Sequence, residues 1–261
     1  MKTLLRACVL LALGLLGPVL ARAQTVVVSL TFDDPANRLE QTGSADTTFA
    51  PANGAVTFAT GFDGGTAAVF DGESSLQASD TPLFSALTVA FWMKTTTDNG
   101  LAGGQWYQGA GLVDGELAGD TNDWGLSQLG THVAFGIGAS DRTIFSTSSV
   151  NTGEWIHVAA TWDTSGNMSL YLNGQLETTY GGGSTVPRNT SNQFYIGQDL
   201  SGNSFTGSLD QIQIFDSVLS AGQIASLAAV PEPATYASLL GGGILCLVMS
   251  RWRRGRKRPV A

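Results

Sequence analysis

Between residues 24 and 229 the chain is a succession of short apolar runs separated by Gly, Asn, Asp and Ser. Runs of this length are typical of β-strands, whereas apolar residues at helical spacing are almost absent. The predicted strands are 25–32, 67–70, 87–94, 124–128, 133–138, 154–162, 168–172, 193–197 and 208–216. Many short strands in one body favour an all-β fold of two packed antiparallel sheets, a sandwich or jelly roll.

Two local patterns add detail to this prediction. Asn173 and Gly174 stand between alternating runs and tolerate the positive φ angles of a type I′ turn, so residues 154–179 are predicted as a three-stranded meander. Near the end of the body, Ser220 and Gln223 have the spacing of a reciprocal helix cap. This spacing predicts one short helix over residues 220–227, the single helix expected in the body.

The N-terminal end has the three parts of a secretory signal peptide. Lys2 and Arg6 precede an apolar run at 7–20, and alanines flank Arg22. Small residues at this spacing fit the site that signal peptidase cleaves. Residues 1–23 are therefore predicted to be a signal peptide that is removed after Ala23.

The C-terminal end is predicted to contain a transmembrane helix. Residues 234–250 are almost wholly apolar, and as a helix they span about 25 Å, close to the roughly 30 Å of a bilayer core. Arg251, Arg253 and Arg254 follow directly, and basic flanks of this kind stay in the cytoplasm. The sequence thus predicts a single membrane pass with the body outside and the C-terminus cytoplasmic.

A short motif precedes this segment. Pro231, Glu232 and Pro233, followed by the apolar span and the Arg-rich end, make residues 230–258 closely resemble the PEP-CTERM protein-sorting signal. The resemblance implies a Gram-negative bacterium and an inner-membrane intermediate. It also implies an exosortase-type membrane protease as partner, removal of the tail, and release to the cell surface or extracellular matrix.

The body is strongly acidic. Four of the 13 basic residues and all but one of the 21 acidic ones lie in residues 24–229, which gives this part a formal charge of about −16. Nucleic acid is excluded as a partner, because phosphate binding needs clustered Lys and Arg. A disulfide scaffold is also excluded, because Cys8 and Cys246 both fall outside the body.

Six sequence blocks of the body resemble laminin-G-like domains of the concanavalin A-like lectin/glucanase type. In order they are LTFD at 30–33, AVFDG at 68–72, LTVAFWMK at 87–94, EWIHVAATWD at 154–163, LYLNG at 170–174 and GSLDQIQIFD at 207–216. The resemblance implies a jelly roll over residues 24–229. Members of this group bind sugars, bind proteins, hydrolyse glycans or act as spacers, so the fold alone does not define a function.

The resemblance also implies a Ca²⁺ site where the first and last strands meet, with Asp33, Asp34 and Asp210 as ligands. Calcium prefers carboxylate and carbonyl oxygens, which this acidic chain supplies. Asp210 is predicted to share a face with Ile212 and Ile214, where an unpaired carboxylate is costly. Either a metal ion or a cage of backbone N–H groups would satisfy it.

A ligand site is predicted at Trp106 and Tyr107. Sugar binding on this fold uses exposed aromatic rings, and this aromatic pair lies on a loop between Gly104 and Gly109, where a core position is not expected. The alternative is that Trp106 is an anchor that packs the loop onto the sheet.

Enzyme activity is not expected. Glycan hydrolysis needs two carboxylates across the scissile bond, and the best-spaced acids, Asp114, Glu116, Asp120 and Asp123, are predicted to be solvated loop residues. His157 lies within a strand, where packing or hydrogen bonding is the expected role.

These predictions combine into one hypothesis. The protein is exported, its laminin-G-like domain is non-catalytic, and that domain binds carbohydrate or has a structural role in an extracellular polysaccharide matrix. Two alternatives stay open. One is a glycan hydrolase or lyase with an atypical acidic site, which convergent acids with shifted pKa values would support; the other is a protein-binding adhesion module.

Overall fold

The computed structural model describes residues 24–80, 82, 84–99, 104–119, 122–138, 142–186 and 194–229. The predicted signal peptide, Pro-Glu-Pro motif, membrane segment and Arg-rich end all lie outside the described residues. Within those ranges, the structure contains no helix that is long and apolar enough to cross a membrane.

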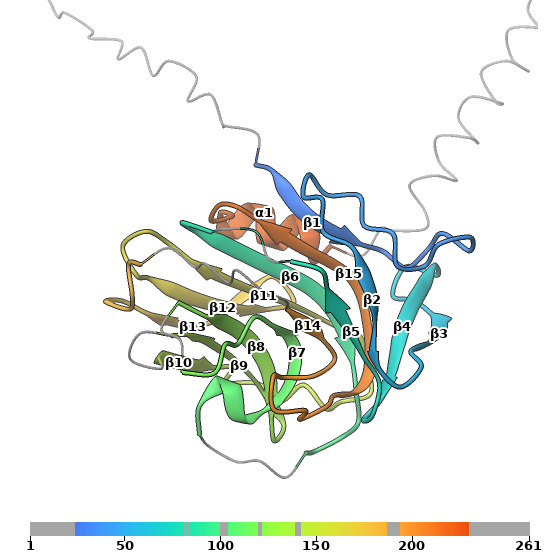
Figure 1. Cartoon of the computed structure of the whole chain (residues 1–261). Helices are drawn as coiled ribbons and strands as arrows, with labels where there is room; N and C mark the ends of the chain where they lie inside the picture. The colour runs from blue at the N-terminus through green and yellow to red at the C-terminus, as the bar shows by residue number, and fades with distance from the viewer. Residues whose placement is uncertain are drawn as a thin grey trace, which may run out of the picture.

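The body is a sandwich of two antiparallel sheets (Figure 1). The eight-stranded sheet has the order β13 (Gln175–Tyr180), β12 (Met168–Leu172), β11 (Ile156–Trp162), β6 (Leu87–Lys94), β15 (Thr206–Phe215), β4 (Thr66–Asp71), β3 (Thr57–Thr60), and β1 (Val26–Leu30) also pairs with β15. The seven-stranded sheet has the order β10 (Arg142–Phe145), β9 (His132–Ile137), β8 (Trp124–Leu129), β7 (Ala110–Asp114), β14 (Tyr195–Ile196), β5 (Ser75–Ala78), β2 (Phe49–Asn53). The predicted all-β, two-sheet fold is confirmed.

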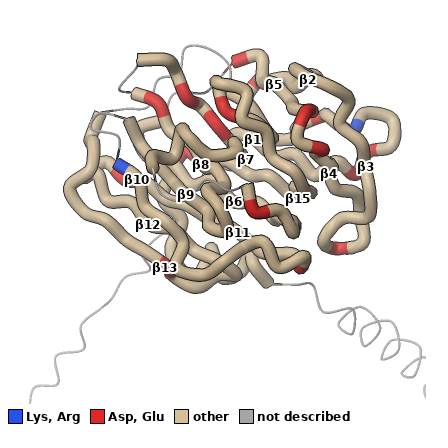
Figure 2. Tube along the Cα trace, turned by 90° about the horizontal axis from the view of Figure 1, so that it is seen from below, with Lys and Arg blue, Asp and Glu red and all other residues tan. Residues whose placement is uncertain are grey.

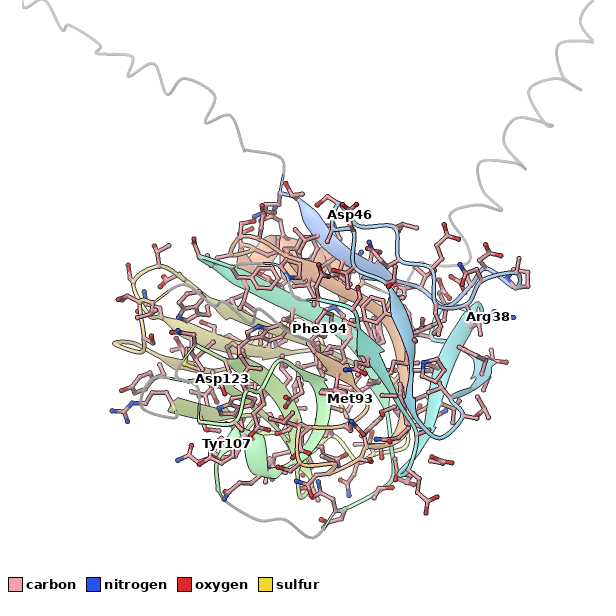
Figure 3. The ribbon with its side chains drawn as sticks, in the orientation of Figure 1. Arg38, Asp46, Met93, Tyr107, Asp123 and Phe194 are labelled. Carbon is pink, nitrogen blue, oxygen red and sulfur yellow. The ribbon has the colours of Figure 1, made fainter. Side chains whose placement is uncertain are left out.

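The hydrophobic core fills the space between the sheets. Along β6, Phe91 and Met93 are fully buried in this core, while the alternate residues Ala90 and Trp92 lie on the outer face of the sheet. This is the two-residue period of a strand covered on both sides. Figure 3 shows Met93 and Phe194 within the body, and both belong to the same core cluster. Acidic positions outnumber basic ones around this core (Figure 2).

Both local predictions are confirmed. Asn173 and Gly174 have φ angles of 48° and 76° and join β12 to β13, which completes the meander. The helix α1 (Ala221–Leu227) begins at Ser220, whose hydroxyl accepts from the Gln223 N–H in a reciprocal cap. Ile224 then packs α1 onto the outer face of the eight-stranded sheet.

One prediction about β15 is wrong. Asp210 does not share a face with Ile212, because a bulge at Gln211, with φ of 47°, shifts the register between Asp210 and Gln213. Asp210 is paired with Trp92, and cross-strand partners project to the same side of a sheet. The bulge therefore moves the carboxylate from the core side to the outer face, as bulges often do near binding sites.

Candidate ligand-binding site

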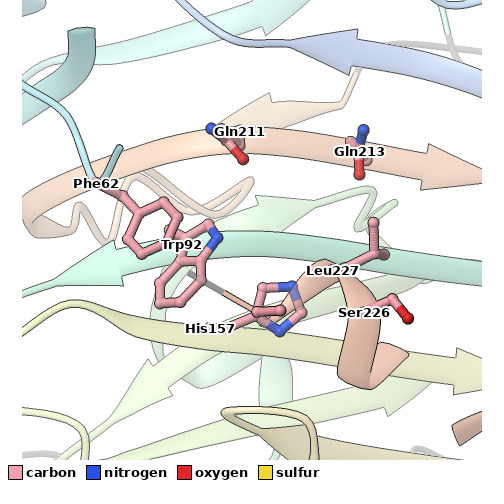
Figure 4. A pocket seen from close by; sticks show the side chains of 8 residues that line it. Phe62, Trp92, His157, Gln211, Gln213, Ser226 and Leu227 are labelled. Atoms are coloured by element: carbon pink, nitrogen blue, oxygen red, sulfur yellow. The ribbon is translucent and has the colours of Figure 1, made fainter. Parts of the chain in front are cut away.

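A pocket of about 220 Å³ lies on the outer face of the eight-stranded sheet. It is bordered by the turn that contains Phe62, by β15 and by the C-terminal part of α1 (Figure 4). The lining residues are Phe62, Trp92, His157, Gln211, Gln213, Ser226, Leu227 and Ala229. None of these side chains except the histidine can carry a charge, so the pocket is aromatic and polar but uncharged in an acidic protein.

Aromatic rings form one side of the pocket. Phe62 stacks on Trp92 with 3.4 Å between ring centroids and 10° between ring planes. His157 meets Trp92 edge-on at 5.2 Å, because the two residues are cross-strand partners on β11 and β6. Trp92 is only 4% exposed between these two rings. The stack therefore presents a rigid, largely apolar wall to anything that enters the pocket.

His157 contributes a buried polar atom. The residue is 2% exposed, and its Nδ1 has no hydrogen-bond partner among the described residues. Burial lowers the pKa of His157 to about 4, so the ring is neutral at pH 7. A neutral imidazole with an unsatisfied nitrogen lacks one hydrogen bond, and a ligand in the pocket could supply it.

Two glutamine amides complete the polar side. Gln213 is half-buried, and its side chain makes no hydrogen bond with any described residue. Gln211 donates from Nε2 to Asp63 Oδ2 at 2.8 Å, which fixes its side chain despite the left-handed backbone. Amides offer both donors and acceptors, and Figure 4 shows the two glutamines along β15, on the side facing Trp92 and His157.

Asp210 lies beneath the turn that carries Phe62. Its Oδ2 accepts from the Phe62 N–H at 2.9 Å and its Oδ1 from the Gln211 N–H at 2.7 Å. Asp33 caps the other end of the same turn by accepting from the Thr66 N–H at 2.7 Å. The alternative predicted for Asp210, a cage of backbone N–H groups, is what the structure contains.

The three predicted calcium ligands do not form one cluster. Asp34 is exposed and accepts from the Ala36 N–H at 2.8 Å, apart from the bonds made by Asp33 and Asp210. Across the described ranges, no three His, Cys, Asp or Glu side chains are arranged to hold a metal ion. Burial raises the pKa of Asp210 to about 6, and the charges of Asp63 and Asp33 add to this effect. The donor set therefore fits backbone capping better than a calcium ion.

The predicted aromatic loop site is only partly accessible. Trp106 is fully buried, so it is not the exposed ring expected for a sugar site but the alternative, an anchor that packs the loop onto the sheet. Its ring lies flat on the outer face of the seven-stranded sheet over Gly125 and Gly136, where any Cβ atom would overlap the indole. Glycines at both positions are what allow this approach. Tyr107 is half-exposed and packs edge-on against Trp106 at 5.8 Å, and ligand binding there stays a prediction.

Acidic residues converge beside Trp106. Asp114 and Asp123 are 0% and 5% exposed, so the expectation of solvated loop acids is wrong for both. Asp199, a residue that the sequence did not single out, joins them with 0% exposure because β14 pairs with β7. Asp120 lies outside the described residues. The strand pairing of β7 with β14, which no local pattern indicates, creates this carboxyl cluster.

The carboxyl cluster holds protons more tightly than free acids do. Burial raises the pKa of Asp114 well above its ordinary value. Burial, followed by the charges of Asp199 and Asp123, raises the pKa of Glu116 to about 7. Asp114 Oδ2 and Glu116 Oε2 have no hydrogen-bond partner in the described part of the chain. Groups of this kind can exchange a proton near neutral pH.

The fold defines an all-β domain of two packed antiparallel sheets. Residues 70–225 match the family model of the concanavalin A-like lectin/glucanases superfamily, Laminin_G_3. The chain belongs to this family. Residues 229–254 match the PEP-CTERM protein-sorting motif, which marks the protein as exported. Both resemblances predicted from the sequence are confirmed.

Three proteins similar to this chain differ in how much of their own length the match covers. The rat (Rattus norvegicus) sushi, von Willebrand factor type A, EGF and pentraxin domain-containing protein 1 is 32% identical over 171 residues, which covers 61% of this chain and only 4% of that protein. Domain 4 of AbnA, a GH43 extracellular arabinanase from Geobacillus stearothermophilus solved with arabinotriose, has a TM-score of 0.63 at 20% identity, covering 79% of this chain and 99% of that domain. The binding domain of botulinum neurotoxin serotype G has a TM-score of 0.60 at 19% identity over 78% of this chain and 50% of that one. At these identities the two structures establish the fold alone.

Proposed function

We propose that this protein is a non-catalytic component of the cell surface or extracellular matrix, and that its domain binds a neutral glycan in the pocket between Phe62, His157 and α1. The observation that carries the proposal is the composition of the pocket. It combines a stacked aromatic wall, an unsatisfied buried imidazole nitrogen and two amides, and none of the described residues that line it has an acidic or basic side chain other than the neutral His157.

This chemistry suits an uncharged sugar. Sugar rings have apolar C–H faces that pack on aromatic surfaces, and hydroxyls that pair with amides and imidazole. A cavity of about 220 Å³ is smaller than the roughly 300–1,000 Å³ of sites for drug-sized ligands. We therefore expect it to receive one or two sugar rings, such as the end of a chain or a side branch.

The sorting motif supports the matrix part of the proposal. A PEP-CTERM motif implies processing by an exosortase, and on this account the protease removes the tail and releases the body. Replacing Pro231, Glu232 and Pro233 by alanines should leave uncleaved protein in the membrane fraction. Normal release of that variant would contradict the sorting role.

Isothermal titration tests the binding function. Arabinotriose is the first probe, since domain 4 of AbnA was solved with it, followed by xylo-, manno- and gluco-oligosaccharides of equal length. One neutral class should bind. Gln213→Ala should weaken binding about three- to tenfold, the effect of one lost hydrogen bond to an uncharged ligand. Gln175→Ala, an exposed residue of β13, is the matched control. No binding by any class would contradict the proposal.

The carboxyl cluster favours a second candidate, glycan hydrolysis. Glu116, with a pKa of about 7, is the residue that could donate a proton to a leaving group at neutral pH. The reducing ends released from neutral and acidic polysaccharides measure this activity. Hydrolysis that disappears in Glu116→Gln would establish an enzyme, and the same low release in both proteins would leave binding as the function.

A further inference from the structure

A second hollow, of about 260 Å³, lies where the edges of the two sheets meet. β10 is the edge strand of the seven-stranded sheet and β13 is the edge strand of the eight-stranded sheet. A hydrogen bond of 2.6 Å from Thr178 Oγ1 to the Phe145 carbonyl joins the two edges. The hollow is lined by Gly104, Gln105, Arg142, Thr143, Phe145 and Tyr180, so it is built from three separate parts of the chain.

Arg142 is the cation among the described residues that line the hollow. Its guanidinium carbon lies 5.3 Å from the centre of the Tyr180 ring, and it makes no hydrogen bond or ion pair with any described residue. Contact with an aromatic face orients a planar guanidinium and leaves its N–H groups available. Figure 2 shows one of the few basic positions of the body at β10.

The carboxylate of the neighbouring edge strand is already occupied. Glu177 of β13 accepts from the N–H groups of Thr147 and Ser148 at 2.9 Å each, and from the Ser148 hydroxyl at 3.0 Å. These bonds lower the pKa of Glu177, against the effect of burial, so the side chain is an anion with its oxygens satisfied. Its oxygens are engaged in these bonds, and it forms no ion pair with Arg142.

The other polar groups of the hollow also leave donors available. Thr143 Oγ1 donates to Gln105 Oε1 at 2.7 Å and accepts from the Trp106 N–H at 3.1 Å. The Gln105 oxygen is thus occupied, while its Nε2 has no partner among the described residues. Because Trp106 is buried, this network fixes Gln105 to a rigid part of the fold. The Gln105 amide and the Arg142 guanidinium therefore both offer N–H donors to the hollow.

We infer that this hollow binds the carboxylate of an acidic sugar, a uronate residue, through Arg142 and Gln105. A guanidinium pairs with a carboxylate through two parallel hydrogen bonds. Phe145 and Tyr180 are both half-exposed and give the sugar ring an apolar surface. One cation matches a monoanion, whereas phosphate sites usually combine several donors with higher charge. The remaining volume accommodates the ring that carries the carboxylate.

Titration with trigalacturonate and its neutral methyl ester tests this inference. Trigalacturonate should bind the protein, and the ester should bind at least tenfold more weakly. Arg142→Gln should abolish the difference between the two sugars. Arg142→Lys should recover only part of it, because an ammonium keeps the charge but not the planar pair of donors. Lys94→Gln, which removes an exposed cation elsewhere, should bind like the unchanged protein.

Two further ligands show whether binding needs the sugar ring as well as the negative charge. Acetate and inorganic phosphate should bind at least tenfold more weakly than trigalacturonate, since neither uses the aromatic surface. Equal binding of acetate, equal binding of the methyl ester, or unchanged binding by Arg142→Gln would each overturn the inference. Neutral-glycan binding at the His157 pocket should be unaffected in Arg142→Gln, so failure of one site is distinguishable from failure of the other.

Discussion

The backbone N–H of Phe62 donates a hydrogen bond of 2.9 Å to Asp210 Oδ2. Through this bond, a carboxylate on the longest strand positions the ring that stacks on Trp92 and forms one wall of the pocket. The bulge at Gln211 makes the contact feasible, because it turns Asp210 to the outer face. Through this bond Asp210 acts as a positioning residue for the pocket.

Asp210→Asn should destabilise the protein by about 1–3 kcal/mol, because one buried backbone N–H then faces an amide that satisfies it less well. Neutral-glycan binding should weaken as the Phe62 turn loosens. Urea unfolding measured with Ca²⁺ and with EGTA should show the same loss. Asp34→Asn, at an exposed site with one local hydrogen bond, should change stability by less than about 0.5 kcal/mol. A loss seen only with Ca²⁺ present would instead establish a calcium site.

The carboxyl cluster should make stability fall as pH rises. The folded-state pKa of Glu116 is about 7, above its ordinary value of 4.5, so the folded state binds more protons in this window. Its contribution is fully present below about pH 4.5 and is lost progressively up to about pH 7. Urea unfolding of the unchanged protein and Glu116→Gln between pH 4.5 and 8 measures this. The stability advantage of the variant should grow with pH, and a constant difference would contradict the effect.

The effect of His157 on stability should be opposite to that of Glu116: stability should fall as pH falls. Glycan binding should nevertheless be insensitive to mild acid. Its folded pKa of about 4 lies below the ordinary 6.5, so its contribution is present above pH 6.5 and is lost as pH falls toward 4. The ring stays neutral in the folded protein down to about pH 5. Glycan affinity at pH 5.5 and 7.5 should therefore agree within about twofold. A steep loss of affinity between these values would show that the imidazole is protonated there.

Gly136→Ala should destabilise the protein by about 1–3 kcal/mol, the usual effect of inserting a methyl group into a packed site. The added Cβ overlaps the Trp106 indole, so the ring must leave its place and its fluorescence should shift to longer wavelength. Gly222→Ala is the control: in α1 no atom lies within 4 Å of its Cβ position, and stability should rise by roughly 0.5–1 kcal/mol. Unchanged stability in Gly136→Ala would contradict the packing described for Trp106.

Local patterns were sufficient to predict the strands that carry strong apolar periodicity. β6 and β12 begin and end at the predicted residues, and the cap at Ser220 is present. Five strands are not predicted because their local patterns are weak: β2 contains Pro51, β3 is exposed at every position, β5 and β10 have only four residues each, and β7 contains Gly111. These strands are held in place by hydrogen bonds to neighbouring strands, and a local sequence pattern does not show those bonds.

The candidate sites depend on contacts between distant parts of the chain. Phe62 and Trp92 carry no shared sequence pattern, and His157 joins them only because β11 pairs with β6. The bulge at Gln211 places Asp210 on the outer face of the sheet, opposite to the prediction. No Gly or Pro stands at the bulge to indicate it in the sequence. The burial of Trp106 has a related cause, since the glycines that leave room for its ring lie far along the chain on β8 and β9. The sequence holds one indication of the pocket, namely a histidine, His157, and a tryptophan, Trp92, within predicted strands.

The most direct test of neutral-glycan binding compares His157→Phe with the unchanged protein. Phenylalanine keeps an aromatic ring at this position but removes the unsatisfied Nδ1, so we expect the variant to fold and glycan binding to weaken about three- to tenfold. His132→Phe, on β9 of the other sheet, should bind normally. A purely structural histidine would give the reverse, namely a less stable protein that still binds. Full glycan affinity in a folded His157→Phe variant would contradict the account.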